Sequence, residues 1–363
     1  MISNLHSIPI HCLLGIPINT ISEARTVEVL WHAVRNRQKL VLTTPNLNFV
    51  MNCRKNLDFL NSVLQSDLNV ADGMPLVWIS KLLGISIKNR VAGSSVFEHI
   101  RNHFPPDNGP TMRVFFFGGA PGVAKQAHKN INSNSQGMVS VGFIDPGFVS
   151  VDEMSSQQFI EQINASRADF IVVALGAEKG QAWIQKNRER LSASVISHLG
   201  AVINFSAGSV KRSPLWMQKS GLEWLWRIKE EPKLWRRYFS DGLSLCKILL
   251  CEVFPLFLHL KFHSLSNKRR SSGLVETGVK FEGEIAIIWP APHRLDEVIN
   301  ILDDFVGEVC IDWSRTAFVD SATLGLLLAF MGRRSFLGRK TVSLNVSRSI
   351  RRQLNWYGLS YFK

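Results

Sequence analysis

Cysteine is scarce in this 363-residue chain and follows no pattern. Cys12, Cys53, Cys246, Cys251 and Cys310 are scattered and odd in number, without the short paired spacings of metal sites or disulfide frameworks. A reducing compartment therefore fits the chain best, and the cysteines predict neither a bound metal nor a disulfide.

Low-complexity tracts, a collagen-like period and internal repeats are absent as well, which excludes a fibrous or repeat protein. The N-terminus lacks a basic segment followed by a continuous apolar stretch and a small-residue cleavage site, so we expect no signal peptide and a cytoplasmic location. The formal charge of +13 favours an anionic partner, such as nucleic acid, a phosphorylated small molecule or an acidic membrane. No helix-turn-helix, zinc or RNP pattern is present, so we expect no nucleic acid partner.

The length of the chain suits two domains, because single hydrophobic cores stop growing near ~250 residues. Over residues 25–210, short apolar runs alternate with helical patterns, which predicts a Rossmann-like, mostly parallel α/β sheet with helices on both faces. The clearest strands are 40–43, 114–117, 170–174 and 195–199. Three of them run into turns rich in Gly or Pro, at 44–46, 118–122 and 176–180. Because ligands bind at the carboxyl ends of parallel strands, we expect the functional site at these turns.

Residues 211–240 interleave tryptophans with basic residues, which suits a helical appendage that binds something both anionic and apolar. Residues 243–262 have the length of a membrane span, about 20 residues. The polar or helix-breaking residues within them, Lys247, Glu252, Pro255 and His259, make a stable span unfavourable. An interfacial helix and a buried core helix remain as alternatives.

A polar, basic linker over residues 264–278 predicts a domain boundary. We therefore expect a large α/β domain with its basic, Trp-rich appendage over 1–242, an amphipathic segment and linker over 243–278, and a small α/β domain over 279–363.

Four polar residues form the densest candidate site. Thr44 and Asn46 follow a strand end, where a hydroxyl and an amide can hold a hydroxylated ligand. Asp72 stands between a polar strand and a helix start, so its carboxylate can be a general base, a sugar or ribose ligand, or a helix N-cap. Arg90 precedes a Gly-Ser turn and suits a phosphate clamp, because guanidinium groups bind phosphate bidentately, although a surface arginine would look the same.

Gly118 and Gly119 open the run Gly-Gly-Ala-Pro-Gly between a strand and a helical pattern. Backbone amides in such a run can approach a pyrophosphate at the N-terminus of the helix. The spacing matches neither the dinucleotide fingerprint nor the phosphate-binding lysine loop, so a tight strand-to-helix turn is an equal alternative.

In their order along residues 10–240, these motifs resemble the WecG/TagA/CpsF family of glycosyltransferases. The residues that carry the resemblance are Thr44-Pro45-Asn46, Ala71-Asp72-Gly73-Met74-Pro75, Arg90-Val91-Ala92-Gly93, Phe117-Gly118-Gly119, Asp145-Pro146-Gly147-Phe148, Gly200-Ala201-Val202, Phe205-Ser206-Ala207-Gly208, Arg212-Ser213-Pro214-Leu215-Trp216, Gly221-Leu222-Glu223-Trp224, Glu231-Pro232 and Arg236-Arg237-Tyr238. Single pieces are common in proteins, but so many in this order are a strong signal.

The resemblance implies an inverting transfer, without an obligatory metal or other cofactor, from a UDP-sugar to a polyprenyl-diphosphate-linked sugar in exopolysaccharide, capsule or other surface glycan synthesis. It implies that Asp72 is the base rather than a cap, that Thr44 and Asn46 line the pocket, and that Arg90 engages a substrate phosphate. The basic, Trp-rich segment of the family is expected to close over the active site at the membrane. Here that segment holds Arg212, Arg227, Arg236 and Arg237. We therefore expect peripheral attachment to the inner face of the cell membrane.

One departure from the family concerns the donor site. Family members carry Gly-x-Pro-x-Gln-Glu-x-Trp after the third strand, whereas this chain has Gly-Ala-Glu-Lys-Gly-Gln-Ala-Trp over residues 176–183. The family glutamine position is therefore Gly180, and Gln181 in the next position is the candidate substitute.

Residues 281–363 resemble a STAS domain, a small α/β module of anti-sigma factor antagonists and anion transporters. The segments that carry this resemblance are 309–312, 318–327 and 354–359, with Ala322-Thr323 in place of the usual Ser-Gly pair. Ser321 aligns with the position that is phosphorylated in regulatory members, and such a module implies a protein partner. The alternative is that Ser321 is only a helix N-cap. A catalytically decayed regulator or scaffold working through this module is the competing function, against which the retention of Asp72 and Arg90 argues.

Overall fold

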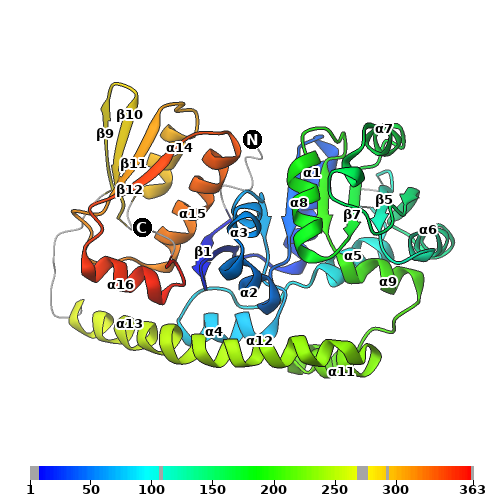
Figure 1. Cartoon of the computed structure of the whole chain (residues 1–363), viewed down its shortest axis with the longest axis horizontal. Helices are drawn as coiled ribbons and strands as arrows, with labels where there is room; N and C mark the ends of the chain where they lie inside the picture. The colour runs from blue at the N-terminus through cyan, green and yellow to red at the C-terminus, as the bar shows by residue number, and fades with distance from the viewer. Residues whose placement is uncertain (1–7, 106–108, 268–276, 292–293, 361–363) are drawn as a thin grey trace. The chain divides into compact units, whose positions relative to one another are not determined.

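The computed structural model of the chain describes residues 8–105, 109–267, 277–291 and 294–360 (Figure 1). Its contacts form two units, of which the first holds residues 21–75 and 89–239 and the second holds residues 9–20, 76–88 and 240–363. The strands are β1 (Ile10–Leu13), β2 (Ile16–Asn19), β3 (Leu40–Thr43), β4 (Leu68–Asn69), β5 (Met112–Gly118), β6 (Met138–Ile144), β7 (Phe170–Ala174), β8 (Val195–His198), β9 (Gly278–Glu282), β10 (Ile285–Trp289), β11 (Glu308–Asp312) and β12 (Thr341–Leu344).

Helices connect most of the strands along the chain. They are α1 (Glu23–Arg35), α2 (Leu47–Lys55), α3 (Leu57–Leu64), α4 (Met74–Leu82), α5 (Gly93–Asn102), α6 (Val123–Asn134), η2 (Glu153–Ser155), α7 (Gln157–Ala165), α8 (Ala177–Asn187), α9 (Gly200–Ala207), α10 (Leu215–Ser220), α11 (Glu223–Glu230), η3 (Pro232–Leu234), α12 (Trp235–Ile248), η4 (Leu249–Val253), α13 (Phe254–Asn267), α14 (Leu295–Leu302), α15 (Ser321–Phe336) and α16 (Arg348–Trp356).

A six-stranded, all-parallel sheet in the order β4-β3-β8-β7-β5-β6 forms the centre of the first unit and confirms the predicted fold class. β3 and β7 coincide with the predicted strands, and β5 and β8 differ from the predictions by one or two residues at their ends. After β3 the chain adds the edge strand β4 and then crosses to β5 in the other half of the sheet. Open α/β sheets bind ligands where the strand order reverses in this way, so β3 lies at the expected site.

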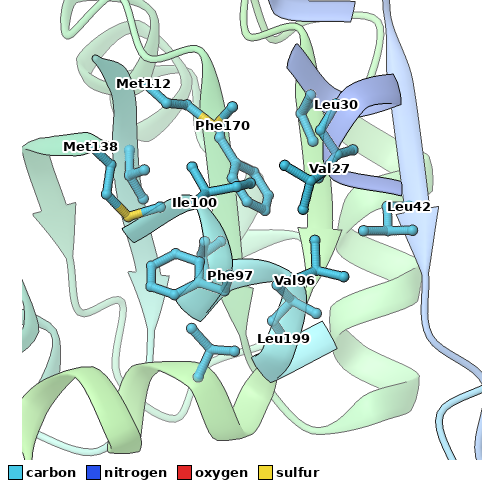
Figure 2. Close-up of a cluster of buried hydrophobic side chains, with 14 of the residues drawn as sticks. Val27, Leu30, Leu42, Val96, Phe97, Ile100, Met112, Met138, Phe170 and Leu199 are labelled. Carbon is cyan, nitrogen blue, oxygen red and sulfur yellow. The ribbon is translucent and has the colours of Figure 1, made fainter. Parts of the chain in front are cut away.

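Both faces of this sheet are buried, because alternate residues of each strand enter different cores. Leu40 and Leu42 of β3 belong to one core, together with residues of α1 and α5 (Figure 2). Val41 belongs to the opposite core, where the indole of Trp183 in α8 stacks on Phe117 with ring centroids 4.3 Å apart. This double burial explains why the strands are apolar throughout and why helices cover both faces.

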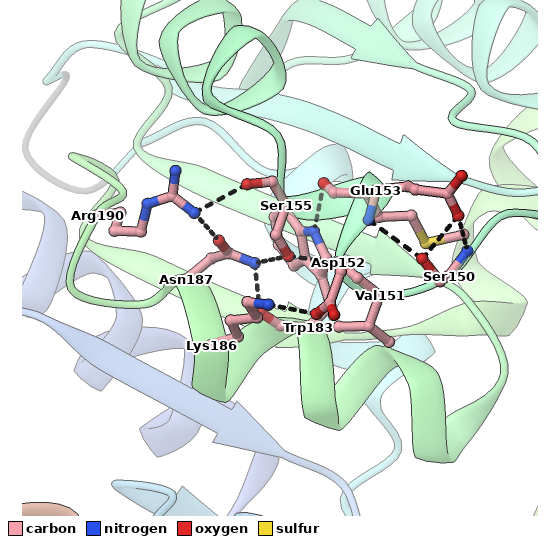
Figure 3. A network of polar contacts seen from close by, with 10 residues as sticks. Ser150, Val151, Asp152, Glu153, Ser155, Trp183, Lys186, Asn187 and Arg190 are labelled. Carbon is pink, nitrogen blue, oxygen red and sulfur yellow. Dashed lines mark hydrogen bonds and ion pairs between the residues drawn. The ribbon is translucent and has the colours of Figure 1, made fainter.

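A polar network fixes η2 against α8 on that second face (Figure 3). The indole Nε1 of Trp183 donates to the carbonyl oxygen of Met154 at 2.9 Å, and Asn187 Nδ2 donates to Ser155 Oγ at 2.8 Å. Arg190 Nη1 donates to the Ser155 carbonyl oxygen at 2.9 Å. These bonds satisfy buried polar groups, so the segment before α7 is held to α8 by specific contacts as well as by packing.

The second unit contains a mixed four-stranded sheet in the order β12-β11-β10-β9, in which β10, β11 and β12 are parallel and β9 is antiparallel to β10. Helices α14, α15 and α16 accompany this sheet, as predicted for a small C-terminal α/β unit. The resemblance of this unit to a STAS domain stays a prediction.

The N-terminal hairpin β1–β2 belongs to this second unit and lies directly on α15. A Cβ added to Gly325 of α15 would lie 2.7 Å from the Cα atom of His11, and one added to Gly15 would lie 2.6 Å from the carbonyl oxygen of Gly358. Glycine is therefore required at both points, since any side chain would collide with backbone. The large domain predicted over 1–242 includes residues 9–20, and these domain bounds stay a prediction.

Ser321 is the first residue of α15 rather than its N-cap, so the N-cap interpretation is wrong. Asp320 caps the helix, and its Oδ1 accepts a hydrogen bond from the Thr323 N–H at 2.7 Å. The Ser321 hydroxyl instead forms a 3.1 Å hydrogen bond with Nδ1 of His11 in the hairpin. Phosphorylation of Ser321 stays a prediction.

One helical run in the described chain, Pro232–Leu265, is long and apolar enough to cross a membrane, by length and composition alone. Its most apolar 18-residue window has a mean hydropathy of 1.8, and only 17% of that window is buried. Residues 243–262 lie within this run, so they do not form the buried core helix that was one alternative.

Candidate active site

Three loops meet beyond the carboxyl ends of β3 and β4. The Asp72 N–H donates to the Pro45 carbonyl oxygen at 2.8 Å, and the Val91 N–H donates to the Ala71 carbonyl oxygen at 2.8 Å. These bonds join the loop after β3, the loop after β4 and the segment before α5. The structure therefore brings together the four residues of the densest predicted site, Thr44, Asn46, Asp72 and Arg90.

The Asp72 carboxylate lies at the N-terminus of α5. Its Oδ1 accepts a hydrogen bond from Arg90 Nε at 3.1 Å, and the carboxylate also accepts one from the N–H of Gly93, the first residue of α5. Asp72 thus faces a helix that begins about twenty residues later in the chain, and the helix that it precedes in sequence is α4. Positive backbone dipole and guanidinium charge both favour an anion at this point.

Burial raises the pKa of Asp72, and the nearby Glu223 carboxylate raises it further. Arg90 and the Gly93 N–H act in the opposite direction, but the net shift of the pKa is upward. The Asp72 side chain keeps 21% of its surface exposed, so it can reach a bound ligand. An accessible carboxylate with a raised pKa is a stronger base than an ordinary aspartate, as general base catalysis requires.

The Arg90 guanidinium is shared by two carboxylates. In addition to its contact with Asp72, its Nη1 lies 2.6 Å from Oε2 of Glu223, the first residue of α11. Both carboxylates raise the pKa of Arg90, which keeps the guanidinium charged. No role was predicted for Glu223, although it lies in a family motif and is the single acidic residue within 211–229, a signal that could have identified it.

Thr44 and Asn46 have different environments. Thr44 is buried, and its hydroxyl oxygen would lie 3.3 Å from a Cβ added to Gly93, so its side chain borders the start of α5. Asn46 is the N-cap of α2, where its Oδ1 accepts a hydrogen bond from the Phe49 N–H at 3.1 Å. The side-chain Oδ1 of Asn46 therefore caps α2, and its side-chain Nδ2 can donate to a ligand.

Gly118 and Gly119 form the tight turn between β5 and α6. Their φ angles are +99° and +97°, and the Gly119 N–H donates to the Ala174 carbonyl oxygen at 2.8 Å. A Cβ added to Gly118 would lie 2.7 Å from that same carbonyl oxygen. Backbone geometry alone thus explains why glycine stands at both positions. Contact of this turn with a pyrophosphate stays a prediction.

Gln181 is fully buried in α8, and neither polar atom of its amide has a hydrogen-bond partner among the residues that the structure describes. The family glutamine position is Gly180 in this chain. The imidazole ring of His198 fills the space that a side chain at Gly180 would need, because a Cβ added there would collide with the ring. Burial lowers the pKa of His198, and its Nε2 lies 2.5 Å from the Leu175 carbonyl oxygen, to which the neutral ring donates. His198 therefore fills the position of the missing side chain.

The four predicted arginines of the appendage divide into two groups. Arg212 Nη2 donates to Ser95 Oγ at 2.5 Å in the first turn of α5, and Arg227 lies over the ring of Phe205, 5.4 Å from its centroid. Arg236 and Arg237 are exposed beside the rings of their neighbours Trp235 and Tyr238. In the described ranges, no group of three or more His, Cys, Asp or Glu side chains is arranged to hold a metal ion.

Comparison with known proteins gives one family match. The sequence profile of the glycosyl transferase WecG/TagA/CpsF family matches residues 11–255. Two relatives carry the name N-acetylglucosaminyldiphosphoundecaprenol N-acetyl-beta-D-mannosaminyltransferase. The one from Bacillus spizizenii is 28% identical over 201 residues, which cover 55% of this chain and 74% of the relative. The one from Bacillus subtilis strain 168 is 27% identical over 209 residues, which cover 58% of this chain and 78% of the relative.

Proposed function

The chain belongs to the WecG/TagA/CpsF family and is a glycosyltransferase, and from this premise we propose that it moves a sugar from a UDP-sugar to a polyprenyl-diphosphate-linked sugar, with inversion. The names of the two relatives support the acceptor class, because both describe transfer to N-acetylglucosaminyldiphosphoundecaprenol. The product would serve a bacterial exopolysaccharide, capsule or other surface glycan.

The observation that carries this proposal is the Asp72 carboxylate held between Arg90 and the N-terminus of α5. Asp72 takes the proton of the acceptor hydroxyl while that oxygen forms a bond to the anomeric carbon of the donor. The bond from this carbon to the phosphate oxygen breaks, and UDP leaves with the electron pair. Attack from the face opposite UDP inverts the configuration. Arg90, a charged bidentate donor, stabilises the negative charge of a substrate diphosphate.

We further propose that the enzyme works at the inner face of the cell membrane, because α12, η4 and α13 carry a one-sided apolar surface. Exposed side chains of this lipid-facing stripe are Leu243, Leu250, Phe254, Leu258, Phe262 and Leu265. Side chains of Ile248, Val253 and Leu256 in the same helices are buried. One face therefore packs against protein while the other presents apolar groups, as in helices that lie in a membrane interface.

A π-helical turn, η4, lies within this stripe between α12 and α13. Four-residue spacing, as in Phe254, Leu258 and Phe262, advances about 40° per step around an α-helix, and the three-residue step to Leu265 turns back by about 60°, so these side chains stay on one face. Lys247 and Lys261 lie in the same helices and add charge that suits anionic lipid headgroups.

The experiment that tests the function measures UDP release from a panel of UDP-sugars, with and without a lipid diphosphate sugar acceptor. Acceptor-dependent release supports the transfer reaction. Binding of a protein partner without any release, across the whole panel, would instead favour the decayed regulator or scaffold. The intact arrangement of Asp72 and Arg90 supports the enzyme.

A further inference from the structure

The guanidinium of Arg90 lies between the carboxylates of Glu223 and Asp72, so the three side chains together carry a net negative charge. The Arg90 contacts measure 2.6 Å to Glu223 and 3.1 Å to Asp72, and each of the three side chains keeps only about a fifth of its surface exposed. Two carboxylates and one guanidinium give a group with a formal charge of −1. Because these side chains are largely buried, a further anion that enters this site meets net repulsion as well as the cost of losing its own hydration.

A phosphate group would compete directly with Glu223. Guanidinium groups bind carboxylates and phosphates through the same planar donors, so the Glu223 carboxylate occupies a position on Arg90 that suits a phosphate oxygen. A diphosphate carries at least two negative charges, and its approach to Glu223 would be repulsive. A phosphate that binds the same Nη1 donor of Arg90 must therefore take the place of the Glu223 carboxylate.

The helix that carries Glu223 lies at the surface of the first unit. α11 has no buried residue, and it follows Gly221, whose φ of +77° forms the turn after α10. Few apolar contacts oppose a displacement of a helix without buried side chains. Glu223 can therefore withdraw from Arg90 while the sheet and α5 stay in place.

A second guanidinium already approaches the same end of α5. Arg212 binds Ser95 in the first turn of α5, whose first residue Gly93 binds Asp72. The buried Nε of Arg212 has no hydrogen-bond partner in the part of the chain that the structure describes. A guanidinium donor without an acceptor among the described residues suits the binding of a further anion near the N-terminus of α5.

We propose that Glu223 is a placeholder anion: it occupies Arg90 in the substrate-free enzyme and is displaced by a substrate phosphate. This inference rests on the proposed function and adds a residue that acts through Arg90. Glu223 thereby keeps the Arg90 guanidinium in position between turnovers and opposes the binding of diphosphates.

Calorimetric titration of the full chain with UDP, and separately with inorganic pyrophosphate, tests the proposal. Removing the charge in Glu223→Gln should tighten binding by about fivefold, the equivalent of a partly exposed ion pair. In the absence of the Arg90 guanidinium the gain should disappear, so Arg90→Gln/Glu223→Gln should bind no more tightly than Arg90→Gln, because the two residues act on one site. Glu230→Gln, which removes an exposed carboxylate from the same helix, is the matched control and should bind as the parent does.

Weaker or unchanged binding by a folded Glu223→Gln variant would overturn the proposal, because Glu223 would then support the site or have no part in it. Absence of binding by both the parent and Glu223→Gln would also overturn it. If Glu223→Gln does not melt cooperatively, Glu223→Asp replaces it, since a shorter side chain withdraws the carboxylate and should tighten binding to a smaller extent. Failure of the proposed function is separate, because it would appear as absence of acceptor-dependent UDP release by the parent enzyme.

Discussion

The Nε atom of Arg90 lies 3.1 Å from Oδ1 of Asp72, although the two residues come from separate loops. Their contact joins the proposed base to the residue proposed to bind phosphate, so removing the Arg90 charge would raise the pKa of Asp72. Glu223 extends this coupling to α11. Glu223 thus acts on the pKa of both Asp72 and Arg90, so variants of the three residues are best interpreted together.

Replacing Asp72 by Asn should reduce transfer by roughly 10²- to 10⁴-fold, because the acceptor hydroxyl then has no base to take its proton. Asparagine keeps the shape of the side chain and can still accept hydrogen bonds from Arg90 and Gly93, so the fold should survive. Initial rates of UDP release and a thermal melt check both expectations. Asp58→Asn, which removes an exposed carboxylate from α3, should retain full activity. Near-normal turnover of Asp72→Asn would exclude Asp72 as the base.

The pH dependence of kcat/KM should report the raised pKa of Asp72. The base must be ionised, so activity should be lost as the pH falls through a value above 3.8, the ordinary value for aspartate. Glu223 raises the pKa of Asp72 and Arg90 lowers it. Glu223→Gln should therefore move the acidic limb to lower pH, and Arg90→Gln should move it to higher pH. Shifts in one common direction would contradict this electrostatic account.

The pairing of Gly180 with His198 predicts an unusual substitution pattern. Gly180→Ala should destabilise the protein by about 1–3 kcal/mol, because the new methyl group collides with the buried imidazole. His198→Ala in the same chain should recover part of that loss. Gly176→Ala, at a position with open space, is the control. Urea unfolding measures all four proteins, and an unaffected Gly180→Ala variant would show that the imidazole can move aside freely.

Sequence patterns predicted the first unit well because its strands are apolar runs buried on both faces. Phe170–Ala174 is one such run, and its position followed directly from composition and the flanking turn. The meeting of Thr44, Asn46, Asp72 and Arg90 could be expected in outline, since parallel strands place their carboxyl ends at one edge. The Arg90–Glu223 contact could not, because it joins residues 133 positions apart by a pairing of side chains.

The second unit was harder to predict because its contacts join opposite ends of the chain. The 3.1 Å hydrogen bond between His11 and Ser321 spans 310 positions, and neither residue has a local pattern that indicates the other. Its place at the start of an apolar segment makes Ser321 a candidate cap. Asp320, one residue earlier, is the stronger acceptor and takes that position instead.

Membrane attachment should depend on both charge and the lipid-facing stripe. Arg236→Glu/Arg237→Glu should weaken binding to anionic vesicles, since each basic residue near such a surface contributes about 1 kcal/mol. Leu250→Ser/Phe254→Ser should weaken binding to anionic and neutral vesicles alike, because it removes apolar area. Leu57→Ser, an exposed leucine in α3, is the control. Vesicle sedimentation measures each case, and unchanged binding by both double variants would show that the stripe has another use.

The final prediction concerns the contact between the hairpin and α15. Alanine usually stabilises a helix relative to glycine by about 0.5–1 kcal/mol, so Gly242→Ala in α12, where the added methyl meets open space, should raise stability by that amount. Gly325→Ala in α15 should have the opposite sign and cost about 1–3 kcal/mol, because its methyl group would collide with the backbone of Ile10 and His11. Urea unfolding of both variants gives the comparison, and amide exchange should show faster opening of β1 and β2 in Gly325→Ala. A stabilising Gly325→Ala would show that the hairpin leaves α15 readily and that the C-terminal sheet folds independently of residues 9–20. A destabilising Gly325→Ala would show that the hairpin stays packed on α15. Removal of the chain after residue 278 would then also uncover Leu13 and Ile16, which are buried in the full protein. The two ends of the chain would in that case form one structural unit.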